Sequence, residues 1–153
     1  MQIAPRWAAA AITAIMLCAP IFAQSPALRA ERDLLAAVNQ ARRTQGLSPL
    51  RWDESLAMAA RRHAVEMAEH GSAQHAFEGE PTLSARVKQA GVHFSWLAEN
   101  VTQGPTSEFV HAQFMHSPSH RANILDADMN SIGVGVVERD GQLFAVEDFA
   151  QIH

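Results

Sequence analysis

Three polar residues in this chain have the types and surroundings of a small chemical site. His75, Glu99 and His120 stand in the stretches GSAQHAFEG, WLAENVTQG and SPSHR, where small or turn-forming residues flank each of them. Two imidazoles and one carboxylate are enough protein ligands for a zinc ion that keeps one coordination position open. The same groups can instead serve as a general base and the acid that orients it. Both interpretations stay open, because residues so far apart in sequence do not show by spacing that they meet.

Ser117 precedes His120 by three residues, which raises the alternative of a serine nucleophile with a histidine base. Pro118 favours another role for the serine. Proline is accepted at the first position of a helix, and a serine directly before it is a good N-cap. We therefore expect a short new helix or turn over residues 117–125, in which Ser117 is the cap and His120 the third helical residue. His116 then does not share a helix face with His120. The chain has no HExxH or GxSxG motif and no cysteine-based metal motif.

The other histidines are expected to be structural or exposed. His63 falls on the apolar stripe of a predicted helix, so we expect a buried, hydrogen-bonded core histidine. His70 lies at the end of that helix, where a partly positive ring favours the carbonyl dipoles. No paired context marks the remaining ones, which are His93, His111, His116 and His153.

Four helices are predicted to position these residues. Helical spacing of apolar residues, ended by glycines, predicts helices over residues 27–45, 53–70 and 83–89. Asp53 is placed to cap the second helix, and Thr106 or Ser107 to cap a fourth.

The C-terminal part is predicted to be a β-hairpin. Asp140-Gly141 is a turn signal, and Gly133 and Gly135 leave one face of the preceding strand bare for close approach by another element. Residues 93–105 have no lasting periodicity and are predicted to be extended or irregular. Helices followed by an antiparallel hairpin favour an α+β fold with helices packed on a small sheet.

The first 23 residues are predicted to be a signal peptide. In MQIAPRWAAAAITAIMLCAPIFA, Arg6 precedes an apolar run, and small residues place the cleavage near Ala23. An uncleaved membrane anchor is the alternative, but the run is short for a full span and no basic cluster follows it. Cys18 is the only cysteine and leaves with the signal, so the exported chain has no disulfide. The expected location is the periplasm or the cell exterior.

Taken together, these stretches resemble the CAP superfamily, also called the SCP or sperm-coating-protein-like family, and most closely its short bacterial branch. The matching blocks are LLAAVNQARRTQGLSPLRWDESLAMAARRHAVEMAEHG, QHAFEGEPTLSARVKQAG, LAENVTQG, HAQFMHSPSHRANILDADMNSIGVGVV and FAVEDFA. The resemblance implies one CAP/SCP domain over residues 34–150, entered through an N-terminal segment, residues 24–33. It also implies an α-β-α sandwich with helices around a small antiparallel sheet.

The resemblance further implies a central cleft, formed in the fuller family pattern by two histidines and two glutamates. The first histidine matches His75, the glutamate of the GEN-like block matches Glu99, and the last histidine matches His120. Ser117 stands where the second glutamate would be, so this chain has a reduced cleft of His75, Glu99, Ser117 and His120. Some family members bind a divalent metal through the histidine pair, which implies zinc at His75 and His120. Others bind sterols or other lipids.

Three functions stay open on the sequence. We favour an exported binding module in which His75 and His120 hold a divalent ion, with Glu99 nearby through water. Its partner would be a lipid, sterol or other small molecule, or an envelope or extracellular protein. The second function is a peptidase-like or esterase-like hydrolase, with Glu99 and His120 as candidate catalytic residues. The third is a hydrogen-bonded cluster that only ties loops to the sandwich.

Length and charge narrow the class of protein. At 153 residues the chain has room for one domain. Its net charge of −4, without a dense basic patch, argues against a nucleic-acid partner. We expect no cofactor other than the metal, no membrane-spanning segment after signal cleavage, and a monomer.

Overall fold

The computed structural model describes residues 25–153, so the predicted signal peptide, residues 1–23, lies outside the described part. The elements in chain order are α1 (Pro26–Thr44), β1 (Arg51–Trp52), α2 (Glu54–His70), α3 (Leu83–Gln89), β2 (Phe94–Gly104), α4 (Ser107–His116), α5 (Pro118–Ile124), β3 (Ser131–Arg139) and β4 (Gln142–Ile152). None of the helices in these residues is both long and apolar enough to cross a membrane.

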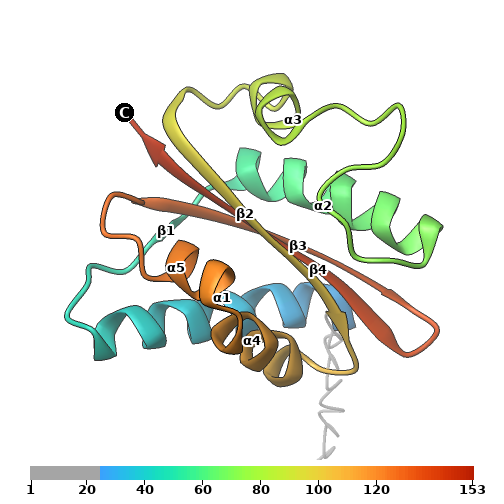
Figure 1. Ribbon diagram of the computed structural model, residues 1–153, viewed down its shortest axis with the longest axis horizontal. Helices are drawn as coiled ribbons and strands as arrows, with labels where there is room; N and C mark the ends of the chain where they lie inside the picture. The colour runs from blue at the N-terminus through green and yellow to red at the C-terminus, as the bar shows by residue number, and fades with distance from the viewer. Residues whose placement is uncertain (1–24) are drawn as a thin grey trace, which may run out of the picture.

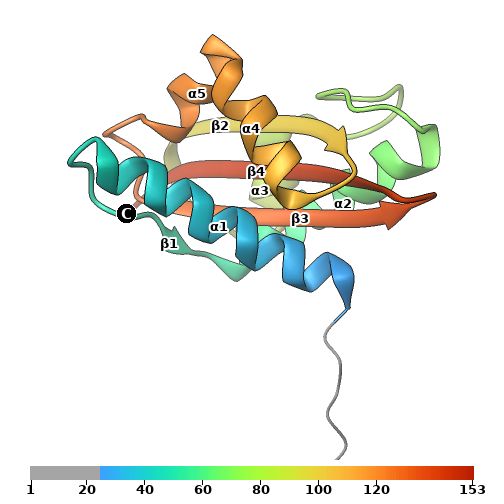
Figure 2. The ribbon, with the colours of Figure 1, turned by 90° about the horizontal axis from the view of Figure 1, so that it is seen from below.

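The elements form three layers, in which a four-stranded sheet lies between two layers of helices. The strand order of the sheet is β1-β3-β4-β2. In Figure 1, α2 and α3 lie along the upper side of the sheet and α1, α4 and α5 along the lower side; Figure 2 shows the second group from below. Strands β3 and β4 form an antiparallel hairpin, and β2 pairs antiparallel with β4. This architecture confirms the expected α+β sandwich. The sheet is mixed rather than purely antiparallel, because the short β1 pairs parallel with β3.

Capping side chains set the predicted helix boundaries. The Asp53 carboxylate accepts a hydrogen bond from the backbone N–H of Leu56 at 2.9 Å, and α2 ends at Gly71, whose φ is +65°. Thr106, not Ser107, caps α4, since its hydroxyl oxygen accepts from the N–H of Phe109 at 3.2 Å. These caps satisfy N–H groups that have no partner inside their own helix.

The two bare glycines of β3 bring α2 directly onto the sheet. A Cβ atom on Gly133 would lie 2.1 Å from the backbone nitrogen of Ala57, and one on Gly135 would lie 2.2 Å from that of Arg61. The predicted close approach is therefore confirmed, with the backbone of α2 as the approaching element. It places the inner face of α2, which carries His63, against the sheet.

Residues 94–104 form an eleven-residue strand, β2, with a register shift between Phe94 and Trp96, where the sequence predicted an extended or irregular segment. The period-two pattern fails here because Glu99, Asn100 and Val101 are all buried in succession. Strand β2 lies at the edge of the sheet and is covered from both faces at this point. Buried polar residues on both faces of one strand are the first structural sign of a site.

Candidate functional site

The three polar residues predicted to form the cleft come from three different elements. His75 lies in the loop between α2 and α3, Glu99 in β2, and His120 in the first turn of α5. The Nδ1 atom of His75 lies 2.9 Å from the Oε1 atom of Glu99. The ring centroids of His75 and His120 are 6.4 Å apart. The fold thus places both imidazoles and the carboxylate beside one stretch of β2.

Arg86, on α3, holds the Glu99 carboxylate in place. Its side chain is only 4% exposed, and one of its terminal nitrogens donates to Oε2 of Glu99. The other terminal nitrogen donates to the carbonyl of Pro81 at 3.0 Å and lies 3.3 Å from Glu80. A buried carboxylate needs such a cation and such hydrogen bonds to remain charged. Arg86 is therefore part of the site, although no local pattern in the sequence marks it.

His63 continues this series of hydrogen-bonded polar side chains into the protein interior. Its Nδ1 atom lies 2.6 Å from Glu80, and its Nε2 atom lies 2.8 Å from the carbonyl oxygen of Gln74, next to His75. The ring is fully buried, which confirms the prediction of a hydrogen-bonded core histidine. His63 thereby ties the loop that carries His75 to helix α2. His70, at the exposed end of α2, stacks on Phe77 in the same loop with ring centroids 4.1 Å apart.

His75 is held in a form that favours the imidazolium. The hydrogen bond with Glu99 raises the pKa of His75 above its ordinary value, while burial and the positive charge of Arg86 oppose that rise. Its side chain is 60% exposed. Because Nδ1 faces Glu99, Nε2 is the nitrogen that remains for a ligand.

His120 is held in the opposite state. Burial first, and then the charge of His75, lower the pKa of His120 and favour the neutral ring. The ring meets Phe114 edge to face, with centroids 5.3 Å apart. The side-chain amide of Asn100 donates to the backbone carbonyl of His120 at 3.2 Å and accepts from Asn123 at 2.9 Å. These bonds tie α5 to strand β2.

Ser117 is the N-cap residue of α5 by position, and Pro118 is the first helical residue, as predicted. The Ser117 side chain, however, makes no capping hydrogen bond; its hydroxyl oxygen lies 3.2 Å from that of Ser119. The described residues show no hydrogen bond between Ser117 and His120. The structure therefore gives Ser117 no base that would activate it as a nucleophile.

The residues of the cleft do not fit a resident zinc site. Within residues 25–153, no group of three or more His, Cys, Asp or Glu side chains is arranged to hold a metal ion. Both oxygens of Glu99 are engaged, one by His75 and one by Arg86, whose positive charge opposes a cation there. His75 and His120 therefore offer two imidazoles, whereas catalytic zinc sites supply three protein ligands and structural sites four.

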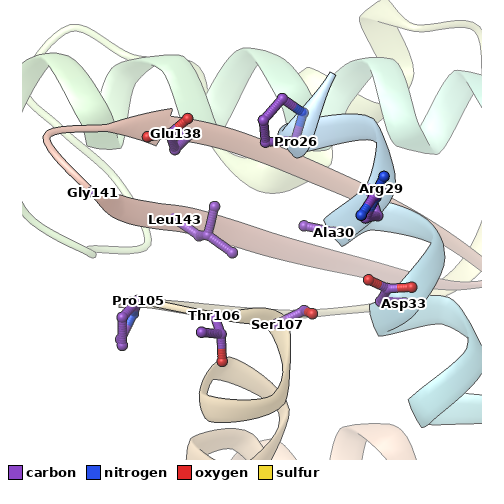
Figure 3. Close-up of a pocket in the computed structure, with 10 residues that line it drawn as sticks. All are labelled: Pro26, Arg29, Ala30, Asp33, Pro105, Thr106, Ser107, Glu138, Gly141 and Leu143. Atoms are coloured by element: carbon purple, nitrogen blue, oxygen red, sulfur yellow. The ribbon is translucent and has the colours of Figure 1, made fainter. Parts of the chain in front are cut away.

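A separate groove of about 450 Å³ lies at the end of the sandwich where α1 begins. Figure 3 shows it between the first turns of α1, the β3–β4 turn and the start of α4. Arg29 and Asp33 line it from α1, and Glu138 and Leu143 from the hairpin. None of the cleft residues lines this groove, so the groove and the polar site are separate features of the fold.

Comparison with solved structures defines the class of protein. An extracellular protein of Bacillus anthracis that contains an SCP domain has the same fold with a TM-score of 0.73, at 25% identity over 82% of this chain and 41% of that one. An outer surface protein of Borrelia burgdorferi gives a TM-score of 0.75 over 82% of this chain and 94% of that one. Its identity is 21%, so this likeness concerns the fold alone.

The chain belongs to the CAP family, described as the cysteine-rich secretory protein family, whose model matches residues 35–149. The resemblance stated from the sequence is therefore confirmed. The protein YkwD of Bacillus subtilis is 33% identical over 109 residues, which are 71% of this chain and 42% of that protein. The chain thus spans less than half the length of this relative.

Proposed function

We propose that this chain is an exported CAP-domain binding module whose cleft holds a polar group of its ligand between His75 and His120. The observation that carries the proposal is the hydrogen bond between His75 and the Glu99 carboxylate, whose other oxygen is bound by Arg86. This chain of contacts orients one exposed imidazole, as a preorganised binding site requires. The predicted signal peptide and the extracellular and surface relatives support export.

The protonation states define the kind of group that fits. The imidazolium of His75 donates a hydrogen bond, and the neutral ring of His120 offers one accepting nitrogen. Since the rings are 6.4 Å apart between centroids, an oxygen-bearing group such as a carboxyl or hydroxyl fits between them. Glu99 acts in this proposal by orienting His75, because its own oxygens are already engaged.

A second candidate function rests on the contrast between the two histidines. Neighbouring groups whose pKa values are pushed apart are the usual arrangement of a general acid and a general base. In a peptidase-like or esterase-like hydrolase, His120 would take a proton from water and His75 would give one to the leaving group. Turnover that requires both histidines, and not Ser117, would favour this candidate over simple binding.

Binding in the cleft is tested with a library of small carboxylic acids and alcohols, screened by NMR against the mature chain, with zinc chloride as an additional probe. We expect the best compounds to shift the signals of His75 and His120 and to lose at least tenfold in affinity in the His75→Ala/His120→Ala variant. The binding free energy of zinc should be far smaller than the roughly 10–16 kcal/mol measured for structural zinc in zinc-finger peptides, because only two imidazoles are present.

The matched control removes two exposed histidines outside the cleft, in the variant His93→Ala/His116→Ala. It should bind the same compounds as the wild type. Equal binding by the wild type and the cleft variant would contradict the proposal. Tight zinc binding by the wild type that the cleft variant lacks would contradict the conclusion that these residues do not fit a resident zinc site.

A further inference from the structure

Two adjacent acidic residues in β4, Glu147 and Asp148, are fully buried next to strand β2. Because successive side chains of a strand point to opposite faces, one acid lies on each face of the sheet. In the register of the strands, Glu147 is paired with Asn100 and Asp148 with Glu99. Each acid therefore lies beside the residue that holds one half of the cleft: Glu99 contacts His75, and Asn100 contacts the backbone of His120.

Asp148 has no cation of its own. Among the described residues, neither of its carboxyl oxygens has a hydrogen-bond partner. The buried charged or titratable side chains on this side of the sheet are Glu99 from β2, Arg86 from α3, His63 from α2 and Glu80 from the loop, and the exposed His75 contacts Glu99. Arg86 is engaged by Glu99, Glu80 and the carbonyl of Pro81. Burial and the charge of Glu99 raise the pKa of Asp148, and Arg86 opposes them less.

Glu147 lies in a similar position on the opposite face. Its Oε2 atom accepts from the amide of Asn100 at 3.1 Å, and its Oε1 atom has no partner within the described part of the chain. The buried or partly buried charged and titratable groups on this face are Glu31 and Arg42 of α1, His111 of α4 and His120 of α5. Among the described residues none of them forms a hydrogen bond or ion pair with Glu147, since Glu31 pairs with Arg61 and Arg42 donates to backbone carbonyls. Burial raises the pKa of Glu147 to about 8. An unpartnered hydroxyl in such a place costs far less than an unpartnered charge.

We propose that Glu147 and Asp148 carry protons at neutral pH and act as positioning residues for the two halves of the cleft, which loosens when these protons are lost. The step is an ordinary acid dissociation, in which each O–H bond gives its proton to solvent and leaves a carboxylate. The new charge on Asp148 repels Glu99, which holds His75. The new charge on Glu147 draws the Asn100 amide away from the His120 carbonyl. This inference rests on the proposed function only in taking the cleft as the binding site.

The test measures unfolding in urea between pH 5 and pH 9 for the wild type, Glu147→Gln, Asp148→Asn and the double variant. Both acids bind a proton more tightly in the folded chain than in the unfolded chain, so stability must fall as the pH rises. For Glu147 the fall runs from about 4.5 towards 8, and for Asp148 it begins near the ordinary pKa of an aspartate. For each acid, the folding equilibrium constant should fall by up to about tenfold per pH unit between its pKa in the unfolded chain and its pKa in the folded chain. Each substitution should flatten the curve, and Glu138→Gln, at an exposed acid of β3, should not.

The ring signals of His75 and His120 report the cleft itself. In the wild type the His120 signals should shift again near pH 8, as Glu147 loses its proton, and the His75 signals should shift again as Asp148 loses its own. In the double variant neither of these second shifts should occur. A wild-type stability curve that is flat from pH 5 to pH 9, or identical curves for wild type and variants, would overturn the proposal. If Asp148→Asn fails to fold, Glu147→Gln and the wild-type curve still decide it. The measurement uses no ligand, so failed probe binding would contradict the proposed function and leave this inference standing.

Discussion

Replacing Arg86 with alanine should lower the free energy of unfolding by roughly 3–5 kcal/mol, the usual cost of removing one partner from a buried ion pair. Arg86 is 4% exposed and lies between the side chains of Glu99 and Glu80, which are themselves 3% and 5% exposed. Without the guanidinium, two carboxylates lose their cation in a place that water does not reach. Urea unfolding at pH 7 measures the loss directly.

The matched control is Arg62→Ala, which removes an exposed arginine from α2. Surface substitutions of this kind usually change stability by no more than about 0.5 kcal/mol. If Arg86→Ala were no more destabilising than Arg62→Ala, the buried contacts that link His63 to His75 through Arg86 would not stabilise the fold.

Replacing Gly135 with alanine should be similarly severe for a different reason. The added Cβ would lie 2.2 Å from the backbone nitrogen of Arg61 and 2.3 Å from the carbonyl carbon of Ala60. These are backbone atoms of α2, so relief requires the whole helix to move off the sheet. Overpacking ordinarily costs about 1–3 kcal/mol, and we expect this substitution to reach or exceed the upper end of that range.

Gly46→Ala gives the comparison for Gly135→Ala. Gly46 has a φ of +72° and open space around its added Cβ, so only the left-handed conformation is penalised, by about 1–2 kcal/mol. Thermal unfolding of both variants separates steric contact from backbone strain. A smaller loss for Gly135→Ala than for Gly46→Ala would contradict the close packing of α2 on β3.

Local signals in the sequence were sufficient for most of the fold. Asp53 and Thr106 are caps that act within three residues of themselves, and Asp140-Gly141 forms its turn with φ values of +52° and +73°. Strand β1 escaped prediction because two residues, paired parallel with a strand about 80 positions away, leave no local pattern. Strand β2 lost its alternation because the site itself buries polar residues on both of its faces.

Only the site residues that lie in recognisable sequence motifs were predicted. His75, Glu99 and His120 were singled out by residue type and flanking sequence and then matched to a cleft by the family resemblance, and the structure brings all three to one part of β2. Arg86, Glu147 and Asp148 were missed, because their importance comes from α3 packing and from the β2–β4 register rather than from neighbouring residues. In the strand FAVEDFA, the only sequence feature that marks Glu147 and Asp148 is their acidic type within an otherwise apolar run. That feature does not predict that they are buried.

The most direct test of the cleft is an NMR titration of the His75 and His120 imidazoles in the wild type and in Glu99→Gln. We expect the pKa of His75 to lie above 6.5 and that of His120 below it. In Glu99→Gln the pKa of His75 should fall, and that of His120 should rise because less positive charge stands beside it. Both rings titrating together near 6.5 in the wild type, unchanged by Glu99→Gln, would contradict a cleft organised by Glu99.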